Sequence, residues 1–373
     1  MNSHSYEITK LEMTITLISM IIGVGILTLP RALATTVETS DGWISIVFGA
    51  VINMFIVFLI VRLHRHFPGK TFIGFWGDKH IGKWVGKLFS VLFLLYFVIL
   101  IAYEARTLSV VVKIYLLDRS PSEVSVLLIF LATTYAVTKG VQGIVHLNLM
   151  FFPIVMMILI IIIVFNIPQA NIDEILPIAA EGLSPIFMGV SETALAFLGI
   201  EILFFFLAYV KPQGLKATML NVGIGFIAIL YLIITLLSFT VIGFESTETI
   251  TFPLVALAKE VEIIEGVVER IEPFMIAVWI MSIFNTMAII HFLATKIVKD
   301  EFVKQGRLSS IAICLAGFAY VITFVPNSVQ EAFLLGDYIS YFGLGLTCFS
   351  LVSGYLFVFF KKKRNKKEKS EVV

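Results

Sequence analysis

The sequence predicts an all-α polytopic membrane protein, with ten transmembrane helices arranged as two inverted repeats of five. The first observation is composition: 59% of the 373 residues are hydrophobic and 14% are charged, whereas soluble domains have roughly 45–50% and about 25%. The second is that the apolar residues form continuous stretches of ~20 residues, the length that a helix needs to cross a bilayer. The third is that two of these stretches, five spans apart, are interrupted by glycine.

Ten apolar segments follow one another and predict a single transmembrane domain over residues 1–360. They lie at about 13–36, 43–63, 87–117, 124–140, 147–166, 184–209, 219–243, 273–295, 309–325 and 338–360. The longer ones exceed the ~20 residues that cross a bilayer, so we expect these helices to tilt or to protrude. The first five fill one repeat, at about 10–166, and the last five fill a second, at 183–360.

The distribution of basic residues predicts that both termini are cytoplasmic, because Lys and Arg are enriched in the cytoplasmic loops of membrane proteins. With the N-terminus inside, most of the 27 Lys and Arg fall on the cytoplasmic side. The exceptions are Arg31, Lys113, Arg119, Lys259 and Arg270 outside, and Arg106 within the membrane. The net charge of +1 therefore conceals a strong separation of charge across the membrane.

The chain ends in a basic tail, residues 361–373, which we interpret as a cytoplasmic anchor that attracts anionic membrane lipid. The tail does not indicate nucleic-acid binding. Cys314 and Cys348 lie in apolar segments, and the chain has neither a CxxC motif nor paired Cys and His at metal-binding spacing. We therefore expect no metal site and no cofactor.

An amphipathic segment at residues 252–271 separates the seventh and eighth spans. Apolar residues from Leu254 to Ile271 recur at helical spacing against acidic residues such as Glu260 and Glu269. Gly266 is placed to divide the segment into two short helices. We interpret it as a lid over an outer vestibule, with a helix lying on the bilayer surface as the alternative.

The first span contains two glycines, Gly23 and Gly25, in mid-membrane, followed by Pro30. Each glycine costs ~1 kcal/mol in helix propensity, and proline breaks the hydrogen-bond ladder. A broken helix persists in a bilayer only where protein or a wet cavity satisfies its freed backbone groups. A half-helix that starts at Ile26 would direct its N–H groups at the midplane, where they suit a carboxylate. The alternative is close packing of helices through small residues.

The sixth span carries a matching interruption. Gly199 lies near mid-membrane, with Glu192 before it and Glu201 after it. Because each half of the chain then begins with an interrupted helix and holds an odd number of spans, the second half must be inverted relative to the first. Secondary transporters built in this way bind their substrates where the two broken helices meet.

Few ionisable residues fall within the spans, and each costs at least ~2.5 kcal/mol at a helix centre unless it has a partner or water. They are Glu104, Arg106, Glu192 and Glu201. Glu201, directly after the break, is the leading candidate to contact a substrate amine or to carry a proton, and a structural hydrogen bond between helices is the alternative. For Glu104 and Glu192 a structural role is the stronger interpretation. Glu104 and Arg106 are two residues apart and therefore point to different faces.

The eighth span adds Asn285 and Thr286, which, with Ser282, could supply oxygen atoms to an ion beside the first span. Ser and Thr in membrane helices more often bond to their own backbone or to a neighbouring helix. We therefore group Asn285 and Thr286 with Glu104 and Glu192 as a possible coupling or polar network.

The chain resembles the spore germination permease family, the B-type integral subunit of nutrient germinant receptors, within the amino acid–polyamine–organocation superfamily. The motifs that carry the resemblance run through spans one to eight: IGVGILTLPR at 22–31, DGW at 41–43, FPGKTF at 67–72, GKWVGK at 82–87, YEAR at 103–106, LLDRSP at 116–121, FLGIEILFFFLAYVK at 197–211 and ERIEPFMIAVWI at 269–280. The resemblance implies a leucine-transporter-type fold with broken helices one and six.

The resemblance also implies a germinant site at the unwound parts of these two helices. Carried over by position, the site comprises Gly23, Val24, Gly25, Ile26, Phe197, Leu198, Gly199 and Glu201. Germinants of such receptors are typically amino acids, and sometimes sugars or nucleosides. The implied partners are an A-type subunit and a lipoprotein C-type subunit. The implied location is the bacterial cell membrane or the spore inner membrane.

Two functions share this predicted pocket. In the first, the chain is a receptor subunit in which germinant binding shifts a conformational equilibrium that the partner subunits read. In the second, it is a stand-alone proton- or sodium-coupled amino-acid permease. A membrane enzyme is disfavoured, because the sequence offers neither a nucleophile–base pair nor a metal cluster.

Overall fold

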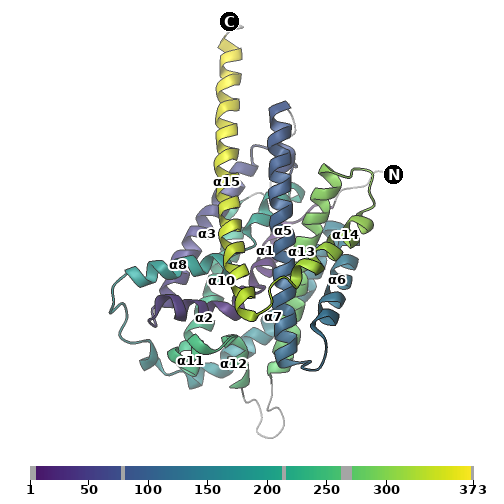
Figure 1. Ribbon diagram of the computed structural model, residues 1–373. Coiled ribbons are helices and arrows are strands. Elements are labelled where there is room, and N and C mark those ends of the chain that lie inside the picture. The colour runs from purple at the N-terminus through teal and green to yellow at the C-terminus, as the bar shows by residue number, and fades with distance from the viewer. Residues whose placement is uncertain (1–5, 77–79, 212–215, 262–270, 371–373) are drawn as a thin grey trace.

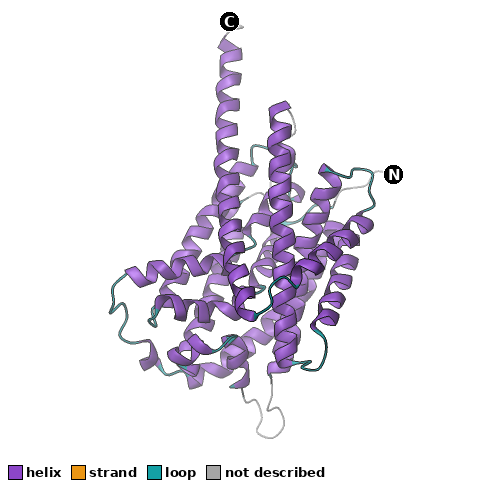
Figure 2. Cartoon of the chain, in the orientation of Figure 1, coloured by secondary structure: helices purple, strands orange, loops and turns teal. Residues whose placement is uncertain are grey.

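We analysed a computed structural model of the chain, which describes residues 6–76, 80–211, 216–261 and 271–370; for 80–81 and 362–370 it describes the backbone alone. Over these residues the regular elements are helices, packed as an elongated bundle (Figures 1 and 2). An isolated β-bridge joins Ile8 to Val210. The prediction of an all-α protein is thus confirmed.

Six helices in the described residues are long and apolar enough to cross a membrane. They are α3 (Gly42–His64), α5 (His80–Tyr115), α7 (Gly140–Asn166), α10 (Ala217–Leu237, extended by a π-helical turn at Ser238–Ile242), α13 (Glu272–Glu301) and α15 (Val329–Ser370). Two further spans are broken pairs, each bent by 51°: α1 (Lys10–Ile22) with α2 (Gly25–Val37), and α8 (Ser184–Ala196) with the short helices of Ile200–Tyr209.

Two apolar helices are shorter, α6 (Ser122–Thr138) and α14 (Leu308–Thr323). By length and composition the described helices supply six spans, or eight if each bent pair is one span. All ten predicted segments are helical and follow the predicted order, but α6 and α14 fall short of 18 residues. The number of ten spans therefore stays a prediction.

The centre of the bundle is formed by α13, which packs against α5, α7, α6, α14 and α1. Its most apolar stretch is 72% buried, more than any other long helix. By contrast only 33% of the residues in the most apolar stretch of α7 are buried, so α7 lies nearer the surface of the bundle. The two broken spans lie beside this centre, and in Figure 1 α2 and α8 both run across the direction of α5 and α15.

Close crossings between α3 and α8 fix the position of the second broken span. A Cβ atom built on Gly49 of α3 would lie 2.2 Å from Thr193 Oγ1, and one on Gly189 of α8 would lie 2.5 Å from Ser45 Oγ. Ser45 also donates a hydrogen bond of 2.7 Å to the Ile186 carbonyl. Small residues therefore let these two helices approach as membrane helices commonly do.

Short elements cover the end of the bundle opposite the C-terminus (Figure 1). They are η1 (Ile167–Gln169), η2 (Ile172–Ile175), α11 (Phe244–Thr249) and α12 (Pro253–Lys259). α12 begins the predicted lid, and its Leu254 and Leu257 are buried as it packs against α2 and α13. Residues 262–270 of the predicted lid lie outside the described residues.

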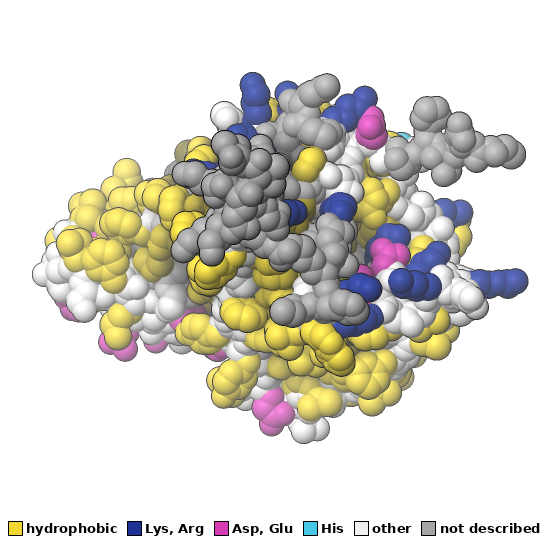
Figure 3. All heavy atoms as spheres, turned by 90° about the horizontal axis from the view of Figure 1, so that it is seen from above, with side chains coloured by type: hydrophobic (Ala, Val, Ile, Leu, Met, Phe, Trp, Pro, Cys, Tyr) yellow, Lys and Arg dark blue, Asp and Glu magenta, His cyan; other side chains and the backbone are white. Residues whose placement is uncertain are grey.

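The N-terminal segment is tied to the end of the sixth span, on the same side as the start of α1. The Ile8 N–H donates to the Tyr209 carbonyl at 2.9 Å, and Lys211 forms an ion pair of 2.8 Å with Glu7. A short helix, α4 (Phe72–Trp76), packs against α5. Figure 3 views the protein from the side of the C-terminus, and the surface seen there carries many Lys and Arg side chains. That this side is cytoplasmic remains a prediction.

The α3–α8 crossing predicts the effect of one added methyl group. Gly49→Ala should destabilise the protein by about 1–3 kcal/mol, because the stiff Thr193 side chain has no room to move away. Gly317→Ala is the matched control, since a Cβ atom there meets nothing within 4 Å. Thermal unfolding of the purified variants tests this, and equal melting temperatures for the two would contradict the close crossing.

Candidate ligand site at the helix breaks

The first break separates α1 from α2 at Gly23 and Val24. Here the backbone leaves helical geometry, with φ −31° and ψ −109° at Gly23. The indole Nε1 of Trp279 in α13 donates a hydrogen bond of 3.0 Å to the freed Gly23 carbonyl. Val24 begins α2 by accepting from the Leu27 N–H at 3.0 Å. Protein donors thus satisfy these freed carbonyls, as a bilayer requires.

The second break follows Ala196 and turns at Gly199, whose φ of +122° suits glycine. The freed Gly199 N–H donates a hydrogen bond of 2.9 Å to Glu201 Oε2. The other carboxyl oxygen, Oε1, accepts a 2.7 Å bond from the hydroxyl of Tyr96 in α5. Both oxygens of this buried carboxyl group therefore accept hydrogen bonds at the break, and the bond from Tyr96 joins two helices.

One side chain joins the two breaks. The hydroxyl of Tyr231 in α10 lies 2.8 Å from the carbonyl oxygen of Ile21, at the end of α1, and 2.9 Å from that of Ala196, at the end of α8. Because a hydroxyl carries one hydrogen, it donates to one of these carbonyls at a time. Tyr231 is fully buried, so no water competes for the bond.

The two half-helices also touch directly. A Cβ atom on Gly25 would lie 2.7 Å from the Cα of Ala196 and 3.0 Å from the Tyr231 hydroxyl oxygen. A Cβ atom on Gly199 would lie 2.6 Å from Met20 Cγ. Gly25 and Gly199 therefore permit close packing of the two broken spans, in addition to breaking them.

Glu104 approaches the first break from α5. Its Oε1 lies 3.2 Å and Thr286 Oγ1 3.0 Å from the Cβ position of Gly23. Thr286 donates to the Ser282 carbonyl at 3.1 Å, whereas Glu104 Oε2 and Asn285 Oδ1 are buried without a hydrogen-bond partner. The structure thus brings Glu104, Thr286 and Gly23 together. A buried carboxyl oxygen without a partner costs free energy.

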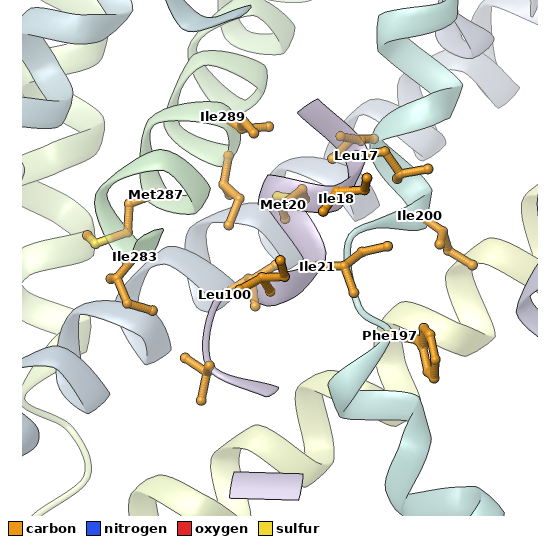
Figure 4. Close-up of a cluster of buried hydrophobic side chains, with 14 of the residues drawn as sticks. Leu17, Ile18, Met20, Ile21, Leu100, Phe197, Ile200, Ile283, Met287 and Ile289 are labelled. Carbon is orange, nitrogen blue, oxygen red and sulfur yellow. The ribbon is translucent and has the colours of Figure 1, made fainter. Parts of the chain in front are cut away.

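Apolar side chains fill the space between the breaks (Figure 4). The figure labels Leu17, Ile18, Met20, Ile21, Leu100, Phe197, Ile200, Ile283, Met287 and Ile289, from α1, α5, the second break and α13. Val24 and Ile26 are buried as well. We call this packed arrangement of the two breaks the closed form.

A cavity of about 440 Å³, which we call the outer cavity, lies beside the crossing of the half-helices and is lined by α2, α8 and the start of α15. Thr28, Ala196 and Glu192 are among its lining residues. A second crevice of about 200 Å³, on the other side of α8, is lined by Phe197, Leu198 and Glu201 among others. Glu192 is thus separated from the other polar candidates and belongs to the outer cavity.

Sequence reasoning missed the three aromatic residues that bond to the breaks, Tyr96, Tyr231 and Trp279. The available signal was that the polar atoms of buried Tyr and Trp need partners, which are scarce in an apolar span. No group of three or more His, Cys, Asp and Glu side chains that could hold a metal ion occurs among the residues with described positions.

A helical bundle in which two broken spans cross is also found in solved structures of other membrane proteins. The chain superposes on MhsT, solved in complex with L-phenylalanine, with a TM-score of 0.68 over 92% of this chain and 89% of MhsT, at 14% sequence identity. It superposes on a Na⁺-coupled sialic acid symporter with a TM-score of 0.67 over 91% of this chain and 77% of the symporter, at 11% identity. The chain therefore has the leucine-transporter-type fold.

Sequence comparison gives the family. The model of the family described as Spore germination protein matches residues 7–332. Spore germination protein YndE of Bacillus subtilis (strain 168) is 31% identical over 92% of this chain and 94% of YndE. The chain belongs to the spore germination protein family, as the sequence motifs predicted.

The bridge between the breaks predicts the effect of removing one hydroxyl group. Tyr231→Phe should destabilise the protein by about 1–3 kcal/mol, because the Ile21 and Ala196 carbonyls lose their donor in a buried site. Tyr135→Phe, at a side chain that is 65% exposed, is the matched control. Thermal unfolding in detergent measures both, and an unchanged melting temperature for Tyr231→Phe would show that the bridge carries no stability.

The two buried glutamates should respond oppositely to the same substitution. Glu201→Gln replaces one of two acceptor oxygens with an NH₂ group and should cost about 1.5–3 kcal/mol. Glu104→Gln removes a carboxyl group whose Oε2 has no partner, so it should leave stability unchanged or raise it. Chemical unfolding of the two variants compares them directly, and a larger loss for Glu104→Gln would refute these assignments.

Proposed function

We propose that this chain is the integral membrane subunit of a spore nutrient germinant receptor and that it binds a small germinant, an amino acid in the first instance, between its two helix breaks. One observation carries the proposal: in a member of the spore germination protein family, two broken helices meet through a single tyrosine hydroxyl. The proposed contact residues are Gly23, Val24, Gly25, Ile26, Phe197, Leu198, Gly199 and Glu201.

The ends of the half-helices suit the two charges of an amino acid. The first turn of α2 presents backbone N–H groups and the positive end of a helix dipole, which favour a carboxylate. The carbonyl groups at the ends of α1 and α8 present the negative ends, which favour an ammonium group. A bound amino acid would supply the hydrogen bonds that Tyr231 now supplies.

Binding of a germinant between the breaks would require the half-helices of the closed form to move apart. Figure 4 shows apolar side chains where the ligand would lie, and Gly25 packs on Ala196, which lines the outer cavity. We propose that the germinant enters this cavity, beneath the lid that begins with α12, and that it stabilises a form with the half-helices further apart. A ligand that binds one of two forms more tightly shifts the population toward that form. A-type and C-type partner subunits would read this shift.

The alternative is a stand-alone proton- or sodium-coupled amino-acid permease, which the superposition on MhsT favours. Both functions use the same pocket, but they differ in whether the ligand crosses the membrane. Glu104, Glu192, Asn285 and Thr286 remain candidates for the coupling network of such a permease.

Uptake by proteoliposomes that hold this chain alone separates the two functions. We expect labelled amino acids to bind saturably without accumulating when a proton or sodium gradient is applied. Gradient-driven accumulation would contradict the receptor proposal and support the permease.

The pocket itself is tested by Gly25→Ala, whose added Cβ atom would lie 2.7 Å from the Ala196 backbone. We expect germinant affinity to fall at least ~10-fold, which corresponds to about 1.4 kcal/mol, because the ends of the half-helices move out of register. Gly345→Ala, where a Cβ atom meets nothing within 4 Å, is the control. Germinant binding is measured with both folded variants in nanodiscs. Equal affinity of Gly25→Ala and Gly345→Ala would show that the germinant binds elsewhere.

A further inference from the structure

The outer cavity carries charges that the proposed midplane site does not use. Its volume of about 440 Å³ falls within the ~300–1,000 Å³ typical of small-molecule sites. Arg31 of α2, Glu192 of α8 and Asp337 of α15 line it, together with apolar side chains such as Leu29 and Leu334. The cavity therefore combines an apolar surface with three charged groups from three helices.

Arg31 is held on one wall. Its Nε donates a hydrogen bond of 3.2 Å to the carbonyl of Glu248 in α11, and its guanidinium carbon lies 5.4 Å from the centre of the Phe333 ring. Among the residues whose side chains are described, no ion pair within 4 Å joins Arg31 to Glu192 or to Asp337. The arginine is thus fixed by other groups and does not neutralise either carboxylate directly.

Glu192 and Asp337 line the same cavity, where two ionised carboxylates repel each other. Both are partly buried, and charges act more strongly on each other beside low-dielectric walls than in water. A cation placed between the two carboxylates would replace this repulsion by two attractions. The apolar parts of the lining suit a cation that carries a hydrocarbon group better than a hydrated metal ion.

We propose that this cavity is a binding site for a small organic ammonium compound, whose charged nitrogen lies between Glu192 and Asp337 and whose hydrocarbon part contacts Leu29 and Leu334. An amino acid would meet this requirement with its ammonium group, and its carboxylate would face Arg31. The cavity is distinct from the proposed midplane site, because none of the eight residues proposed for that site lines it. It therefore does not depend on the midplane site.

Calorimetry with the full chain in nanodiscs tests the proposal, with n-butylamine as the probe and 1-butanol as its uncharged counterpart. We expect butylamine to bind saturably, butanol to bind at least 10-fold more weakly, and sodium chloride at equal concentration not to compete. Equal binding of the amine and the alcohol would overturn the proposal. Competition by sodium at equal concentration would overturn it as well and would indicate an inorganic cation site.

Variants locate the site. Glu192→Gln and Asp337→Asn should each weaken butylamine binding at least 10-fold, whereas Glu245→Gln, which removes a charge from an exposed side chain of α11, should not change it. Unchanged binding in both cavity variants, with melting temperatures near that of the parent, would refute the site. Glu201→Gln, which changes a proposed midplane residue that does not line the cavity, should spare butylamine binding, so failure of the midplane proposal and failure of this one give different results.

Discussion

The structure depends most on the hydroxyl group of Tyr231, which lies within hydrogen-bond distance of the carbonyl oxygens that end α1 and α8. A bilayer offers no water to backbone groups freed by a helix break, so each break needs donors and acceptors from the protein. Tyr231 serves both breaks from one position, while Trp279 and Glu201 serve one each. The two broken spans are therefore one bonded unit, and a change at one carbonyl alters the hydrogen bond available to the other.

This arrangement explains why the closed form is compact, and it is compatible with the opening that we propose. Gly25 and Gly199 let the broken spans touch, and apolar side chains fill the midplane around them. The polar and glycine contacts of the unit are a shared hydroxyl group, the packing of Gly25 on the Ala196 backbone, and a carboxyl group between Gly199 and Tyr96. A ligand with both a donor and an acceptor could replace them without unfolding a helix. The outer cavity lies next to this unit, since Ala196 lines it, so a ligand in the cavity would lie beside the helix breaks.

The sequence predicted the helical segments and their order well, because a bilayer makes hydropathy decisive for each span. It also located both breaks, since a glycine in mid-span weakens the helix at its own position. It did not assign the partners of the breaks: Tyr96, Tyr231 and Trp279 look like ordinary apolar residues until the spans are assembled. The separate place of Glu192, in the outer cavity with Asp337, was equally invisible, because it depends on how α8 packs against α15. Local composition predicts elements, whereas side-chain pairing depends on contacts between residues far apart in the sequence.

The central claim is that the two broken spans form one unit held closed by Tyr231. Pulsed electron paramagnetic resonance tests this by measuring the distance between α2 and α8. The spin labels are placed at the exposed positions Thr35 and Met188. The exposed Cys314 and Cys348 are first replaced by serine. We expect an equimolar mixture of L-amino acids to shift the distance distribution toward longer values, and we expect Tyr231→Phe to produce the same shift without ligand. An identical distribution in all three samples would contradict the central claim.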